Sequence, residues 1–153
     1  MTDIASMPTD ELRRRLDLAD NRYHRAAIGL LDFAGLLDRR DIRAHLDLDT
    51  TGDQAALWVN WRALGADTGL SAMGGTQLRL LRLAVSIACG IPVDLRESLS
   101  GLGHQHARAV LTAVAEAMDI GEDVQITDSP AYSARKRADD EAIAALLAGR
   151  GAE

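Results

Sequence analysis

The chain has 153 residues, of which 47% are apolar and 26% are charged, and its formal net charge at pH 7 is −6. This composition is typical of one globular domain and excludes a disordered chain. The acidic balance and an aromatic content of 3% argue against a broad nucleic-acid-binding surface, which needs a basic face and aromatic rings for stacking.

The N-terminus and the cysteine content indicate the setting in which the chain works. No apolar run is long enough to span a bilayer, and the first residues lack the basic and apolar regions of a signal peptide, so we expect no membrane association and a cytoplasmic location. Cys89 is the single cysteine, so an internal disulfide is excluded, and we expect it to be structural. The dominance of arginine over lysine, with abundant alanine and glycine, suggests a GC-rich, bacterial coding sequence.

The first part of the chain predicts a long helix, with Ser6 or Thr9 as its cap. Apolar residues then recur at alternating steps of four and three, as in a heptad seam: Leu12, Leu16, Ala19, Tyr23, Ala26, Leu30, Phe33 and Leu37. Gly35 permits a bend or an end to this helix. The seam packs either along the central helix of its own chain or against the same helix of a second copy.

A β-hairpin is predicted over residues 45–60. We expect its apolar face to be formed by four cross-strand pairs: Leu48 with Ala55, Leu46 with Leu57, Ala44 with Val59, and Ile42 with Trp61. In this register Asp49 pairs with Gln54, and Trp58 lies on the polar face beside His45 and Asn60. A large exposed aromatic ring there is an anchor for a partner, unless another segment of the chain covers it.

The run from 78 to 89 is the most apolar in the chain and predicts a central buried helix over about 77–89, which ends before Gly90 and Pro92. Asp94 and Glu97 have capping-box spacing and predict a short helix over 95–99. A further helix over 104–118 has one apolar stripe, expected to pack on the central helix: Ala107, Val110, Leu111, Val114, Ala115 and Met118.

The C-terminal part predicts a separate element. Residues 124–126 have the composition of a short strand, Ser129 and Pro130 break the chain, and 133–147 predict a last helix. We therefore expect a single helical domain over 1–128, followed by a linker and a mobile C-terminal helix over 129–153.

The predicted hairpin turn resembles the first half of an EF-hand calcium loop. Asp47, Asp49 and Asp53 provide oxygen ligands at loop positions 1, 3 and 7, with glycine at position 6. The resemblance implies a calcium site with these three carboxylates as candidate ligands. Trp58 stands where the EF-hand supplies its bidentate glutamate, and the same residue types also form an ordinary tight turn.

A second resemblance runs through the central helix. Residues 70–77 resemble the signature loop of ATPase domains of the ABC and chromosome-maintenance type, and Asp94 stands where their Walker B strand ends. The resemblance implies nucleotide chemistry, but no G-x-x-x-x-G-K-[ST] loop is present and Leu95 occupies the catalytic glutamate position. We expect no ATPase activity and interpret the match as a glycine-rich turn before a helix.

The functional prediction is a non-catalytic protein that self-associates through the seam or binds a protein partner with the hairpin face, without a cofactor. The candidate partner-binding residues are Trp58, His45, Asn60, Tyr23 and Leu16. One alternative is a small regulator that contacts nucleic acid through a basic cluster in the last helix, formed by Arg135, Lys136 and Arg137. The other alternative is a metal-binding module at the hairpin turn.

Overall fold

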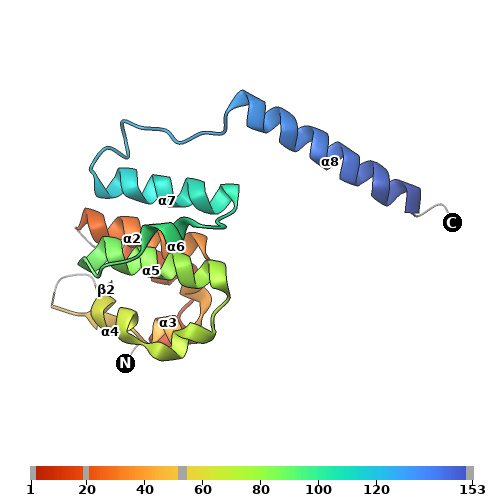
Figure 1. Ribbon diagram of the computed structural model, residues 1–153. Coiled ribbons are helices and arrows are strands. Elements are labelled where there is room, and N and C mark those ends of the chain that lie inside the picture. The colour runs from red at the N-terminus through yellow and green to blue at the C-terminus, as the bar shows by residue number, and fades with distance from the viewer. Residues whose placement is uncertain (1–2, 19–20, 52–54, 151–153) are drawn as a thin grey trace.

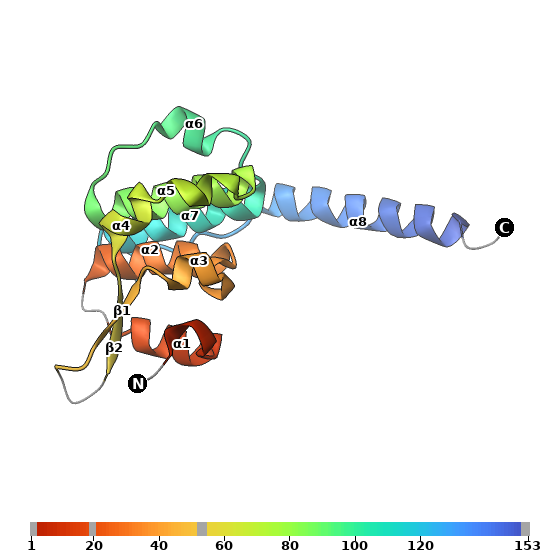
Figure 2. The same ribbon diagram turned by 90° about the horizontal axis from the view of Figure 1, so that it is seen from below.

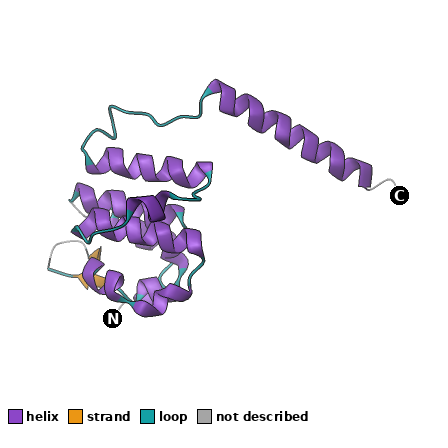
Figure 3. Cartoon of the chain, in the orientation of Figure 1, coloured by secondary structure: helices purple, strands orange, loops and turns teal. Residues whose placement is uncertain are grey.

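The computed structural model describes residues 3–18, 21–51 and 55–150, which form a mainly helical protein with one antiparallel hairpin (Figures 1 and 3). The predicted fold class is therefore confirmed. In chain order the elements, with 3-10 helices written η, are η1 (Ile4–Ser6), α1 (Thr9–Leu16), α2 (Arg22–Phe33), η2 (Leu36–Asp38), α3 (Arg40–Arg43), β1 (Leu46–Asp49), β2 (Ala56–Val59), α4 (Trp61–Ala66), η3 (Thr68–Ala72), α5 (Gly75–Cys89), α6 (Leu95–Leu99), α7 (His104–Ala117) and α8 (Pro130–Arg150).

α5 lies at the centre of the core, as the sequence predicts. α2 packs against both α5 and α7, and the three helices lie side by side (Figure 2). α5 ends at Gly90, whose φ of +72° is a left-handed conformation that glycine adopts without strain. The buried residues of α5 surround most of its circumference: Leu80, Leu81, Leu83, Ala84 and Val85.

α6 is held to α5 by two arginine side chains of the central helix. Arg79 donates to the carbonyl of Ser100 at 2.6 Å, and Arg82 forms an ion pair with Glu97 at 3.5 Å. The predicted cap is present, because Asp94 accepts a hydrogen bond from the backbone N–H of Glu97 at 3.0 Å.

The single long N-terminal helix predicted from the heptad seam is wrong. α1 ends at Leu16, and α2 starts anew at Arg22. The reason is the cap at Asn21, whose side chain accepts hydrogen bonds from the backbone N–H groups of Tyr23 and His24. Such a cap satisfies amide groups that a new helix would leave without partners, so it favours a helix start at this point.

The break divides the seam between a buried part and an exposed part. Tyr23 and Phe33 are 43% and 47% exposed, and Ala19 lies outside the described residues. The other seam residues are buried in the core of the same chain: Leu12, Leu16, Ala26, Leu30 and Leu37. The seam therefore does not form one continuous surface that could pair with a second copy.

The hairpin has a different register from the predicted one. Leu46 pairs with Val59 and Leu48 with Leu57, whereas the sequence prediction paired Leu46 with Leu57. The shift is two residues, so every strand side chain keeps its predicted face, because side chains alternate with a period of two. Asp49 pairs with Ala56, and its predicted partner Gln54 lies outside the described residues.

The hairpin is also shorter than predicted. Ile42 belongs to α3, Ala44 caps that helix, and Trp61 is the first residue of α4, so the two outermost predicted pairs do not form.

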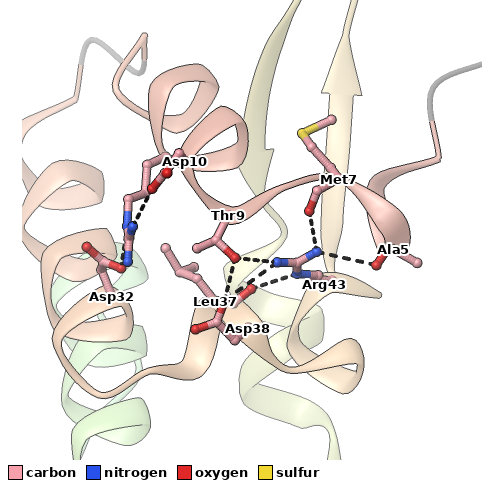
Figure 4. Close-up of polar contacts among 9 residues, drawn as sticks. Ala5, Met7, Thr9, Asp10, Asp32, Leu37, Asp38 and Arg43 are labelled. Carbon is pink, nitrogen blue, oxygen red and sulfur yellow. Dashed lines mark hydrogen bonds and ion pairs between the residues drawn. The ribbon is translucent and has the colours of Figure 1, made fainter.

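Arg43 joins the N-terminal segment to α3 (Figure 4). Its side chain is 8% exposed, and Nε donates to the carbonyl of Leu37 at 2.7 Å. Nη1 donates to the carbonyls of Met7 at 2.6 Å and Ala5 at 3.3 Å, and Nη2 donates to the hydroxyl of Thr9 at 2.8 Å. The fixed fork of guanidinium donors suits this arrangement of several acceptors.

α8 is longer than predicted and projects away from the other helices (Figures 1 and 2). It begins at Pro130 rather than 133, because proline is tolerated in the first helical turn and Ser129 accepts from the N–H of Tyr132 at 3.2 Å. The strand predicted over 124–126 is wrong, since these residues form no regular structure. The domain boundary at residues 128 and 129 and the mobility of the helix stay predictions.

Candidate interaction surface

α7 carries apolar side chains on two faces. One face packs into the core through Val110 and Ala113, which are 6% and 5% exposed. The other face is exposed: Leu111 is 54% exposed, Val114 40% and Met118 62%. With half-buried Ala107, these residues follow steps of four, three and four, which place them on one side of the helix. We call Ala107, Leu111, Val114 and Met118 the α7 stripe.

The α7 stripe corrects the prediction that all apolar residues of this helix pack inward. Of the predicted set, Val110 and Ala115 are buried, and the large residues of the stripe face outward. Exposed apolar residues scattered singly are normal on a protein surface, whereas several on one helix face are typical of an interaction site.

The segment after α7 returns the chain to the N-terminal end of that helix. Asp128 Oδ1 lies 2.7 Å from His104 Nε2 and 3.3 Å from Arg108 Nη1. The ring of Tyr132 stacks on His104, with 3.6 Å between centroids. The hydrogen bond with His104 is the largest cause that lowers the pKa of Asp128, and the bond from Arg108 lowers it further. Desolvation of the carboxylate acts in the opposite direction. α8 therefore starts beside the N-terminus of α7 (Figure 1).

α8 carries its own exposed apolar residues. Ile143, Leu146 and Leu147 are 55%, 70% and 65% exposed and lie three and four residues apart, on one side of the helix. Lys136 and Asp139 precede Ile143 at steps of three and four, and therefore lie on the same side. We call these five residues the α8 face.

Exposed charges of opposite sign lie beyond the ends of these apolar groups. Glu122 and Asp123 follow α7 in the turn after its C-terminus, and we call them the acidic turn. The predicted basic cluster, Arg135, Lys136 and Arg137, is exposed in the first half of α8. The acidic turn is near the C-terminal end of the α7 stripe, whereas the basic cluster precedes the apolar part of the α8 face.

A groove of about 360 Å³ runs between α2 and α7, on the side of α7 away from the stripe. Its floor is formed by small residues and Phe33, and the ion pair between Arg25 and Glu116, at 3.2 Å, borders it. Phe33 meets His106 edge to face, with ring centroids 5.8 Å apart. Sequence reasoning assigned Phe33 to the seam and did not find this groove.

The predicted partner-binding residues do not form one surface. Trp58 is 47% exposed on the hairpin, opposite Asp47, and Tyr23 is exposed at the start of α2. Leu16 is fully buried in the core, so it is not available to a partner in this fold.

The other two predicted residues have structural roles. His45 Nε2 lies 2.9 Å from Asp67 Oδ2. Two hydrogen bonds lower the pKa of Asp67: the larger effect comes from His45 and the smaller from the backbone N–H of Gly69. The side chain of Asn60 caps α4 by accepting from the N–H of Ala63 at 3.2 Å.

The predicted calcium ligands lie at the hairpin turn. Asp47 and Asp49 are exposed, and Asp53 lies outside the described residues. Asp49 Oδ1 accepts from the hydroxyl of Thr51 at 2.6 Å and from its N–H at 2.9 Å, and these bonds lower the pKa of Asp49. Within the described ranges, no group of three His, Cys, Asp or Glu side chains is placed to hold a metal ion.

Comparison of the chain with family models, curated proteins and solved structures finds no match. Among the helices that the structure describes, none is long and apolar enough to cross a membrane.

The candidate surface is argued from the geometry of α7 and α8. One feature of the sequence does indicate this surface. The apolar residues of α7 spread over a wider arc of the helix than one packed neighbour can bury.

Proposed function

We propose that this chain is a non-catalytic interaction protein whose partner-binding surface is the α7 stripe. The observation that supports this proposal is the exposure of Leu111, Val114 and Met118 on one side of α7, at 40–62% each. Burial of apolar surface contributes about 25 cal/mol per Å² to the binding free energy. A partner can cover three large side chains with one surface only where they lie next to each other, as they do on this side of α7.

Trp58 is a weaker candidate for the main contact, because it is the one large exposed apolar residue on the two described strands of the hairpin. Its neighbours on that face of the hairpin are Asp47 and Asp49. We therefore assign Trp58 a secondary role. The α7 stripe offers several apolar contacts on a rigid helix, which suits a partner interface better than one ring beside carboxylates.

Affinity capture of the tagged full chain from its native cells tests the proposal. Leu111→Glu places a charge in the stripe, so we expect it to abolish capture of the bound protein. Thr112→Glu adds the same charge to the next exposed residue, which lies on the groove side of α7, and should leave capture unchanged. Equal capture by the wild type and by Leu111→Glu would contradict the proposal.

A second candidate function is nucleic-acid contact through the basic cluster, favoured by the exposure of Arg135, Lys136 and Arg137 on a projecting helix. Arginine and lysine bind phosphates with an affinity that falls as salt rises. A mobility-shift titration at low salt tests this function. Binding that is lost when all three residues are replaced by glutamine would support it, and no shift at low salt would exclude it.

A further inference from the structure

We infer that the occupant of the α7 stripe is α8 of a second copy of this chain, lying antiparallel to α7, so that two copies exchange their C-terminal helices. The inference rests on the proposed function, because it names the partner of the same surface. Three features carry it: the spacing of the two apolar groups, the charges at their ends, and the place where α8 leaves the body.

The α8 face matches the spacing of the α7 stripe, with a charged residue at one of the matched positions. The α7 stripe follows steps of four, three and four residues, and steps of four and three connect the charged Asp139 to the apolar Ile143 and Leu146 on the α8 face. Antiparallel packing places Leu146 opposite Leu111 and Ile143 opposite Val114. Met118 then lies opposite Asp139, at the edge of the contact. Helices that pack through alternating steps of three and four bury such a stripe continuously.

The charges select the antiparallel direction. With Leu146 opposite Leu111, Lys136 and Arg135 extend beyond the C-terminus of α7, beside Glu122 and Asp123 of the acidic turn. The negative end of the α7 helix dipole also favours cations there. In the parallel direction the same two cations would lie at the positive end of the α7 dipole, beside His104 and Arg108, which already share the carboxylate of Asp128.

The origin of α8 requires that the partner is another copy. Asp128 and Tyr132 hold the start of α8 against His104, at the N-terminal end of α7. If α8 folded back on its own α7 from this point, the two helices would run parallel. The antiparallel arrangement is therefore available between two chains, and a reciprocal exchange closes a symmetric dimer with two identical contacts.

Disulfide trapping between two full-length chains tests the register. Both chains carry Cys89→Ala; one adds Met118→Cys and the other, with a longer tag, adds Asp139→Cys. We expect mild oxidation to link the two different chains, because these positions face each other across the antiparallel contact. The matched control pairs Ala107→Cys with Asp139→Cys, which face each other in the parallel arrangement. Linking of the control pair in preference to the first would overturn the inference.

Charge reversal tests the electrostatic part. We expect light scattering to show a dimer of the full chain, and Lys136→Glu combined with Arg135→Glu to raise its dissociation constant at least about tenfold. Glu122→Lys combined with Asp123→Lys should have a similar effect. All four substitutions together should return the constant to within about threefold of the wild type, because the pairs re-form with reversed signs. Additive weakening without this recovery would overturn the proposed pairing.

A chain that is monomeric at every concentration overturns the inference, and so does a chain carrying both Met118→Cys and Asp139→Cys that links them only within one molecule. The capture experiment with Leu111→Glu then decides the proposed function separately. Capture of another protein that depends on Leu111 leaves the interaction function standing with a different occupant. Capture that is independent of Leu111 overturns both the inference and the proposed function.

Discussion

The N-terminal and C-terminal parts of the chain differ in whether their notable side chains find partners within the same chain. At the N-terminal end, the buried Arg43 finds its acceptors within the chain, and Thr9, which it contacts, also donates to Asp38 (Figure 4). At the C-terminal end, Leu111 of α7 and Leu146 of α8 are left more than half exposed. The difference separates stability from interaction: changes near Arg43 should alter the free energy of unfolding, whereas changes in the α7 stripe should alter association.

The strongest test of this contrast is Arg43→Met. Methionine keeps much of the apolar volume of the side chain but leaves the carbonyls of Leu37 and Met7 without their charged donor. We expect the free energy of unfolding to fall by about 3 kcal/mol, measured by urea denaturation. Arg40→Met, on an exposed neighbour in the same helix, should change it by less than about 0.5 kcal/mol. Equal changes in the free energy of unfolding at the two positions would contradict a stabilising role for the hydrogen bonds of Arg43.

A smaller effect is expected at the contact between α4 and α5. A Cβ atom on Gly65 would lie 2.8 Å from Cγ1 of Val85 and 3.0 Å from Cδ1 of Ile91, so Gly65→Ala should destabilise the fold by about 1–3 kcal/mol in the same measurement. Gly29→Ala in α2 is the control, because its Cβ would meet no atom within 4 Å. Replacing an unconstrained helical glycine by alanine raises the free energy of unfolding by about 0.5–1 kcal/mol, so Gly29→Ala should stabilise the fold.

The anchor of α8 gives a pH-dependent test. The pKa of Asp128 is lowered in the fold, so its contribution is present above the ordinary value of 3.8 and is lost as the pH falls through the lower folded value. His104→Ala removes the side-chain donor that is the largest cause, so an NMR titration should show the pKa of Asp128 rising toward 3.8. The pKa of Asp49, lowered by Thr51, serves as the internal control and should not move.

The smallest effect on stability is expected in the α7 stripe. Leu111→Glu should change the free energy of unfolding by less than about 0.5 kcal/mol, because the side chain already faces solvent. Leu30→Ala, at a fully buried position of α2, should cost about 2–5 kcal/mol in the same assay. If Leu111→Glu destabilised an isolated monomer as much as Leu30→Ala, the stripe would be part of the core rather than a surface.

Sequence patterns predicted those parts of the fold whose signals are local. The central helix, the short helix after Asp94 and the start of α7 at His104 follow from periodicity and capping residues that lie within a few positions of each other. The hairpin register was missed because alternation fixes the face of each side chain, and both registers give Leu46 and Leu48 the same face. The break at Asn21 was missed because its cap lies inside a pattern that otherwise continues.

The candidate surface was harder to predict, since periodicity shows that a helix side is apolar without showing what covers it. Leu111 and Val110 both fitted one apolar stripe, but the core covers Val110 alone. Arg43 carried no signal either, because its acceptors are mostly backbone carbonyls and have no residue preference. His45 was placed beside Trp58 by the hairpin pattern, yet its partner is Asp67, 22 residues further along the chain.

The Arg43 network also bears on the order of folding. Its bond to Met7 closes a loop of 36 residues, so it can form only after the intervening chain has been drawn together. We therefore expect α1 to dock late, after α2 and α3 have formed. A contact made after the rate-limiting step slows unfolding without speeding folding, so this side chain should act as a kinetic latch that sets how long the native state persists.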